Sequence, residues 1–192
     1  MLDALPIPDP TTAPVAWAVV LGACIVGCVT DLRARRLPNV LTLPLWITGL
    51  VFAASTGGFA GFAGALAASV LLATPYVILF AGAGGGAGDA KMMAAIGAWL
   101  GLSHGIYALV VIALLGGVVG VAWSLCNGSA PVLYAKMRTM TLGMVGFAHG
   151  RLTAGECLAF LPPAGGSSRI PYGLAICIGS LAAFGGGLQW HA

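Results

Sequence analysis

Residues 105–125 read GIYALVVIALLGGVVGVAWSL, and this stretch carries no charged side chain. A helix of about 20 apolar residues crosses the hydrocarbon core of a bilayer. The rest of the chain has the same character, because 59% of its 192 residues are hydrophobic and 7% are charged. Soluble domains carry about a quarter charged residues. The sequence therefore predicts an integral membrane protein, and its net charge of +3 does not indicate a nucleic-acid partner.

Five further apolar segments flank that stretch, which gives an all-α fold of about six transmembrane helices in a single domain covering 1–192. The expected spans are 14–30, 40–55, 60–81, 90–102, 105–125 and 171–189. Glycines mark the turns expected after the second and the fourth span. Segment 126–169 is expected outside the membrane on the cytoplasmic side. Within it, 131–148 is interpreted as an interfacial helix that contacts lipid or, alternatively, binds a peptide.

The basic residues fix the expected orientation. In a six-span arrangement they all fall on one side, which the positive-inside rule places in the cytoplasm, with both termini outside. These residues are Arg33, Arg35, Arg36, Lys91, Lys136, Arg138, Arg151 and Arg169.

Two aspartates are expected at the cytoplasmic membrane edge. Asp31 ends the first span and Asp89 begins the fourth. Carboxylates at this depth are costly and mark functional sites. Two close carboxylates share one proton, so the ionised member can activate a water while the protonated member donates to a peptide carbonyl. An alternative for Asp31 is a structural ion pair with Arg35 at i+4.

The surroundings of Asp89 suggest a place for an extended substrate. Residues 82–88 read GAGGGAG, and Gly86 and Gly88 let a second backbone approach closely. The alternative is a linker or small-residue helix packing. Candidate substrate-binding residues are Gly86, Gly88, Lys91, Pro38 and Asn39, although Lys91 could instead extend to the lipid headgroups.

The five cysteines form no CxxC pair, so no zinc-ribbon spacing is present and no metal or cofactor is expected. Their spacing is that of small apolar packing residues.

Three segments carry a family resemblance: DLRARRLPN at 31–39, GAGDAKMMAAIGAWLG at 86–101 and RIPYGLAICIG at 169–179. Together they resemble the prepilin peptidases, and most closely the short branch associated with tight-adherence (Flp-type) pili. The resemblance implies aspartic endopeptidase activity with Asp31 and Asp89 as the catalytic pair. It also implies a bacterial inner-membrane location, prepilin or pseudopilin precursors as substrates, and an association with pilus assembly machinery.

The resemblance further implies cleavage of a short basic leader on the cytoplasmic side. Longer family members also methylate the new N-terminus and carry paired CxxC motifs, which this chain lacks, so methyltransferase activity is not expected. Two other functions stay open: a small proton-coupled transporter, because intramembrane carboxylates are common there, and a non-enzymatic scaffold of a pilus or secretion assembly.

Overall fold

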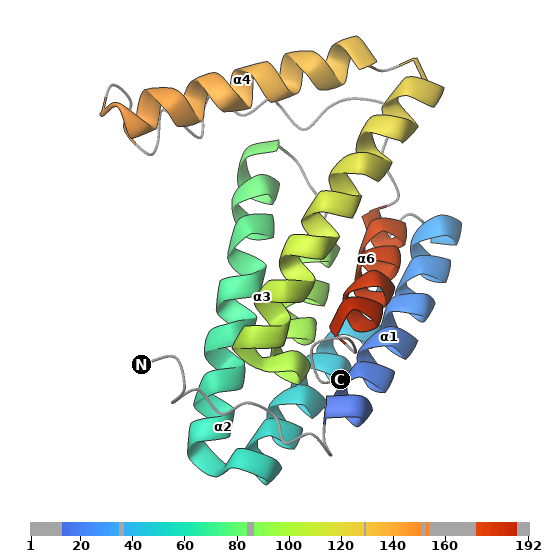
Figure 1. Cartoon of the computed structure of the whole chain (residues 1–192), viewed down its shortest axis with the longest axis vertical. Coiled ribbons are helices and arrows are strands. Elements are labelled where there is room, and N and C mark those ends of the chain that lie inside the picture. Colours follow the sequence, from blue (N-terminus) through green and yellow to red (C-terminus); the bar gives the residue numbers. More distant parts are fainter. Residues whose placement is uncertain are drawn as a thin grey trace.

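The computed structural model of the chain describes residues 13–34, 37–83, 87–128, 130–150, 153 and 172–187. Over these residues the chain forms helices joined by short turns, so the predicted all-α class is confirmed (Figure 1). The helices are α1 (Ala13–Ala34), α2 (Asn39–Ala83), α3 (Ala87–Cys126), α4 (Ala130–Ala148) and α6 (Tyr172–Gly187).

Among the described helices, three are long and apolar enough to cross a membrane: Pro14–Ala34, Asn39–Ile78 and Ala87–Cys126. Helix α6 is apolar but shorter. The chain is therefore a multi-pass membrane protein, but these helices do not support the expected count of six. The difference arises at two glycines, where the chain leaves helical geometry for a single residue and then continues as a helix. Gly58 (φ 60°) and Gly101 (φ 68°) adopt positive φ, which glycine tolerates without a Cβ clash.

Helix α2 reverses direction at Gly58. Trp46 Nε1 donates to Ser69 Oγ over 3.1 Å, although the two residues are 23 positions apart. In a straight helix they would lie about 35 Å apart. Gly61 also lies directly against the carbonyl oxygen of Ala53. Helix α2 is therefore a hairpin of two arms, residues 39–57 and 59–83.

Helix α3 has two corresponding arms, residues 87–100 and 102–126, on either side of Gly101. Gly97 in the first arm touches the backbone of Ala68, and Gly105 in the second arm touches the side chain of Leu72. Both arms therefore pack on the same part of α2, and the α2–α3 interface is the most extensive in the molecule's described part.

The α2–α3 interface is built around an aromatic ring. Trp99 stacks on Phe52 with a centroid separation of 5.0 Å. Its Nε1 also donates to the carbonyl oxygen of Leu45 over 2.8 Å, which satisfies the indole inside the bundle. Gly49 lies against the same indole, where a Cβ would come within 2.8 Å of a ring carbon. The ring thus fixes the first arm of α2 against the first arm of α3.

Helix α6 lies beside α1 and runs antiparallel to it (Figure 1). Three contacts define this pairing, and their residue numbers increase along α1 while they decrease along α6. They are Trp17 with Phe184 (5.7 Å between ring centroids), Cys24 Sγ with Ser180 Oγ (3.5 Å) and Asp31 with Gly173. Helix α6 also runs antiparallel to the second arm of α3. The contacts that show this are Gly186 with Tyr107, Gly179 with Ile112, and Tyr172 with Gly116. The start of α6 is therefore held at the end of α1.

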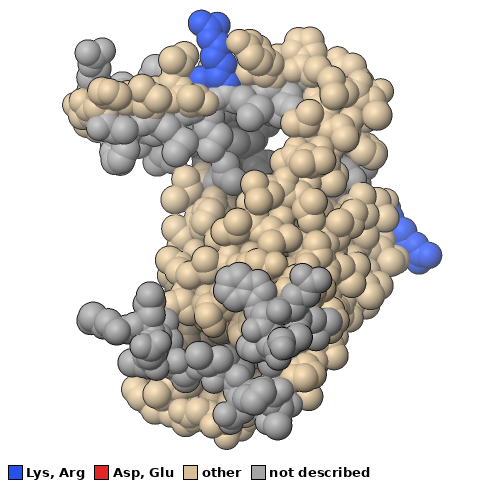
Figure 2. All heavy atoms as spheres, viewed as in Figure 1, with Lys and Arg blue, Asp and Glu red and all other residues tan. Residues whose placement is uncertain are grey.

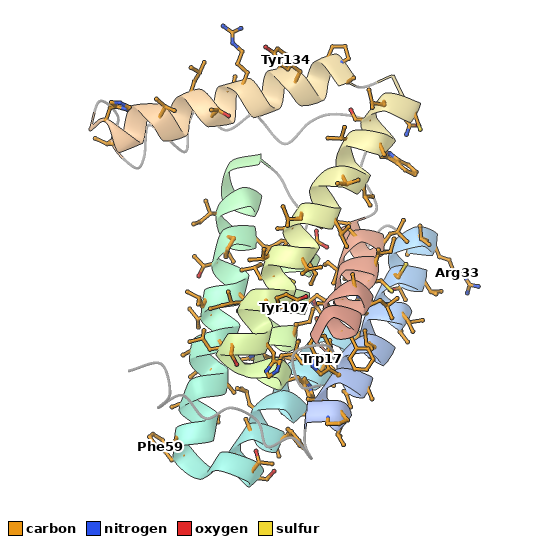
Figure 3. The ribbon with its side chains drawn as sticks, in the orientation of Figure 1. Trp17, Arg33, Phe59, Tyr107 and Tyr134 are labelled. Carbon is orange, nitrogen blue, oxygen red and sulfur yellow. The ribbon has the colours of Figure 1, made fainter. Side chains whose placement is uncertain are left out.

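Helix α4 lies across one end of the α2–α3 pair (Figure 1). The expected helix over 131–148 is thus present, and its role in lipid or peptide binding stays a prediction. On the face drawn in Figure 2, basic side chains lie over α4 and beside the end of α1, whereas the described residues between them show no charged side chain. Arg33 and Tyr134 project away from the bundle (Figure 3). Exposed apolar side chains of α3, such as Leu114 and Val118, are suited to contact with lipid.

Candidate active site

Asp31 lies in the last turn of α1 and is partly buried. Its Oδ2 accepts a hydrogen bond of 2.8 Å from the backbone N–H of Gly173, which lies in the first turn of α6. The N–H groups of a first helical turn have no acceptor inside their own helix, so a carboxylate is a suitable partner. Arg35, the alternative partner expected from the sequence, lies outside the described residues.

Asp89 lies in the first turn of α3, is also partly buried, and interacts electrostatically with Asp31. The two residues that the sequence places 58 positions apart are therefore neighbours in the fold. Two tyrosines, Tyr76 of α2 and Tyr172 of α6, lie near enough to Asp89 for its charge to act on their phenol groups. Their rings meet edge to face with centroids 6.1 Å apart. We call the place where Asp31, Asp89, Tyr172 and Gly173 meet the aspartate junction.

A proline turn connects α1 to α2 beside this junction. The carbonyl oxygen of Pro38 accepts hydrogen bonds from the backbone N–H groups of Leu41 (3.0 Å) and Thr42 (3.3 Å). These bonds start α2 at Asn39, one residue before the expected span 40–55. The turn brings Leu37 and Asn39 to the start of α3.

Two contacts join this turn to the start of α3. Gly88 packs on Leu37 so closely that a Cβ at Gly88 would lie 2.9 Å from the Cβ of Leu37. Lys91 Nζ donates to Asn39 Oδ1 over 2.8 Å on an exposed surface. The structure thus brings four of the residues predicted to bind substrate (Pro38, Asn39, Gly88 and Lys91) to one side of the junction, whereas Gly86 lies outside the described residues. Substrate binding by these residues stays a prediction.

The sequence analysis did not identify Gly173, Tyr172 and Tyr76 as site residues. The signal for the first two was available in the third motif, RIPYGLAICIG, which contains Tyr172 and Gly173. Hydropathy marks that segment only as apolar, so it does not indicate that its first turn faces Asp31. Tyr76 carries no local signal, because it lies within an apolar arm of α2.

Cys24, Cys28 and Cys177 are free and buried between α1 and α6. Within the part of the chain that the structure describes, no group of three or more His, Cys, Asp or Glu side chains is arranged to hold a metal ion. The expected absence of a metal or cofactor stays a prediction.

A bundle of apolar helices with two interacting carboxylates at helix ends defines a membrane protein with a candidate acid–base site. The particular family follows from comparison with known sequences. The sequence model of the type IV leader peptidase family matches residues 18–121, which include Asp31 and Asp89. The chain belongs to this family, and the predicted resemblance is confirmed at that level. Nothing in these matches tests the assignment to the Flp-type branch.

Three curated relatives carry the name prepilin leader peptidase/N-methyltransferase. The protein from Neisseria gonorrhoeae is 35% identical over 105 residues, which cover 51% of this chain and 36% of the relative. That from Xanthomonas campestris pv. campestris is 32% identical over 119 residues, covering 56% and 42%, and that from Aeromonas hydrophila is 40% identical over 97 residues, covering 47% and 32%. The matches thus span about a third to two fifths of these relatives. No solved structure matches the chain.

Proposed function

We propose that this protein is a membrane aspartic endopeptidase in which Asp31 and Asp89 are the catalytic pair. The observation that carries the proposal is the placement of these two carboxylates, in the last turn of α1 and the first turn of α3, within the region matched by the family. The close contact of Leu37 with Gly88 brings these two helix ends together. Both are partly buried among apolar helices. A carboxylate is costly to keep there, which is why such residues mark functional sites.

In the proposed reaction, the ionised aspartate removes a proton from a water held between the two carboxyl groups. The water oxygen attacks the carbon of the scissile peptide bond, and the protonated aspartate donates its proton to the carbonyl oxygen. The tetrahedral intermediate then collapses as the C–N bond breaks. The amine leaves with the proton taken from water, and a hydroxyl proton returns to the second aspartate. The pair regains its single shared proton, so no metal or covalent intermediate is required.

The proposed substrates are type IV prepilins, Flp-like by the motif pattern, or pseudopilins, cut after a short basic leader at the cytoplasmic face of a bacterial inner membrane. The relatives' names support prepilins as the substrate class. Those names also include N-methyl transfer. We propose cleavage without methylation, because the five cysteines of this chain include no paired CxxC motif. Incubating a cleaved pilin with the purified protein and labelled S-adenosylmethionine tests this point, and labelling of the pilin N-terminus would contradict it.

We further propose that the arms on either side of Gly58 and Gly101 each cross the bilayer, which with α1 and α6 gives six crossings and places both termini outside. The chain reversal at Gly58, inferred from the Trp46–Ser69 hydrogen bond, supports this topology. Labelling of single cysteines from each side of sealed vesicles is the test. A cysteine at Phe59 should be labelled only from outside and one at Arg33 only from inside, and labelling of both from one side would contradict the topology.

The test of the function is cleavage of a co-expressed prepilin by separate Asp31→Asn and Asp89→Asn variants. Each should lower the cleavage rate by about 10²–10⁴-fold, the range contributed by general acid–base groups. Asp9→Asn is the matched control, since it makes the same chemical change in a residue outside the region matched by the family and should leave cleavage unchanged. If either junction variant, inserted at the normal level, cleaves at the wild-type rate, the catalytic assignment is wrong.

A further inference from the structure

Asp31 and Asp89 have different hydrogen-bonding environments. Asp31 Oδ2 accepts the Gly173 N–H over 2.8 Å, from a residue 142 positions later in the chain. A backbone amide donates a proton into a hydrogen bond but cannot accept one from a carboxylic acid. The hydrogen bond at Oδ2 therefore favours the ionised form of Asp31 over the protonated form.

Only glycine allows this hydrogen bond to form. A Cβ at position 173 would lie 2.8 Å from the Cβ of Asp31 and 2.9 Å from its Oδ2. Such separations are closer than carbon and oxygen atoms approach without displacement. Gly173 is itself buried, and the Trp17–Phe184 and Cys24–Ser180 contacts hold α6 in register with α1. The amide therefore reaches Asp31 from a fixed position.

Among the described residues, the ionisable groups near the pair do not give Asp89 a hydrogen bond equivalent to that from the Gly173 amide. Lys91, two positions after Asp89, donates to Asn39 Oδ1 instead. Tyr76 of α2 and Tyr172 of α6 are the phenols that share its electrostatic environment, and phenols are neutral near pH 7. Arg33 is exposed and lies at i+2 from Asp31, so it projects from a different side of α1. Among these side chains and the Gly173 amide, the amide is the group seen bonded to one aspartate of the pair.

We propose that Gly173 is a positioning residue that keeps Asp31 as the ionised, water-activating member of the pair and leaves the shared proton to Asp89. This inference rests on the proposed function. It adds a division of labour between the two aspartates and a third element, the first turn of α6, to the site. Asp31 Oδ2 is held by the amide, and its second oxygen is left to take the proton from water.

The first test compares alanine at three glycines of α6. Gly173→Ala places a methyl group against Asp31. Gly179→Ala places one against Ile112, within 2.6 Å, and so disturbs the same helix without touching the aspartates. Gly185→Ala has no atom within 4 Å and serves as the unperturbed reference. Cleavage of a prepilin peptide is measured for each purified variant, with kcat expressed per folded molecule.

Gly173→Ala should lower kcat by about 100-fold with KM unchanged, as expected for a catalytic group displaced by about 1 Å. Gly179→Ala should lower thermal stability but keep kcat per folded molecule within about twofold of wild type, because position 179 lies about 9 Å along α6 from Gly173. Equal kcat values for the Gly173→Ala and Gly179→Ala variants would overturn the positioning role. This result is distinct from failure of the function itself, which active Asp31→Asn or Asp89→Asn variants would reveal.

A second measurement uses the wild-type protein and does not depend on whether Gly173→Ala folds. The chain has four aspartates, so selective ¹³C labelling of aspartate carboxyl carbons gives few NMR signals. The Asn variants assign the signals of Asp31 and Asp89. Near neutral pH the Asp31 carbon should have the shift of a carboxylate and the Asp89 carbon that of a carboxylic acid. The reverse pattern, or two ionised carboxylates, would overturn the division of labour.

Discussion

The α2–α3 interface and the aspartate junction are built in opposite ways. The interface relies on a large ring, Trp99, which stacks on Phe52 and donates to the Leu45 carbonyl. The junction and the turn beside it depend on two glycines, which have no side chain. The backbone of Gly173 lies directly against Asp31, and that of Gly88 lies directly against Leu37. Large buried rings contribute most through the contacts they fill, whereas glycines contribute through the approach they permit. The difference suggests that the interface sets stability and the junction sets the geometry of the carboxylates.

The largest effect is expected from breaking the interface. Trp99→Ala removes a side chain that is 9% exposed, together with its stacking and its hydrogen bond. It should lower the free energy of unfolding by about 3–5 kcal/mol. Thermal or denaturant unfolding in detergent measures this change. Trp123→Ala is the matched control on the same helix, because Trp123 is 36% exposed, and its loss should cost less than about 1 kcal/mol. Equal losses for the two variants would contradict the central role of Trp99.

A smaller effect on stability and a larger one on activity are expected at the junction. Gly88→Ala forces its new methyl group against Leu37, which should cost about 1–3 kcal/mol and displace the adjacent Asp89. The cleavage rate per folded molecule measures the displacement. Leu37→Gly removes the opposing Cβ and should restore part of the rate in the double variant. If Gly88 instead contacts substrate backbone, as the sequence alone suggested, Leu37→Gly gives no rescue.

The smallest effect is expected from the exposed Lys91–Asn39 hydrogen bond, which should contribute about 0.5–1.5 kcal/mol. If the bond holds the turn after α1 against α3, Asn39→Ala and Lys91→Ala should be non-additive, so that the double variant is no worse than the more damaging single one. Rates and KM values from this double-mutant cycle decide the point. Additive increases in KM would instead support independent contacts of the two side chains with substrate.

Much of the fold follows from hydropathy, but the way helices end does not. Apolar segments around residues 105–125 predicted membrane helices, and the glycines at 57–58 and 101–105 predicted breaks. A glycine at which a helix ends and a glycine after which the helix continues in a new direction look the same in a sequence. Gly58 and Gly101 break a single residue each, after which helical hydrogen bonding resumes. The structure therefore contains three long candidate spans among its described helices, where six separate ones were expected.

Asp31 and Asp89 could be selected from the sequence as candidates because each lies in a motif with local spacing, whereas their level in the membrane stays a prediction from the charge distribution. The amide of Gly173 was not predictable by the same means. Its role depends on which face of α6 meets α1, and that is decided by packing between segments 142 positions apart. The contacts at Cys24–Ser180 and Trp17–Phe184 that set this register involve residues with no sequence pattern in common.

The antiparallel pairing of α1 with α6 also orders the events of biosynthesis. Helices α2 and α3 meet through segments close in sequence, so they can associate soon after they leave the ribosome. Helix α1 emerges before them, yet the amide that bonds Asp31 is translated only after α2, α3 and α4. A nascent chain therefore contains both aspartates without a completed junction from the addition of Asp89 until the addition of Gly173. The aspartate junction is in this way completed only after the last described helix has been synthesised.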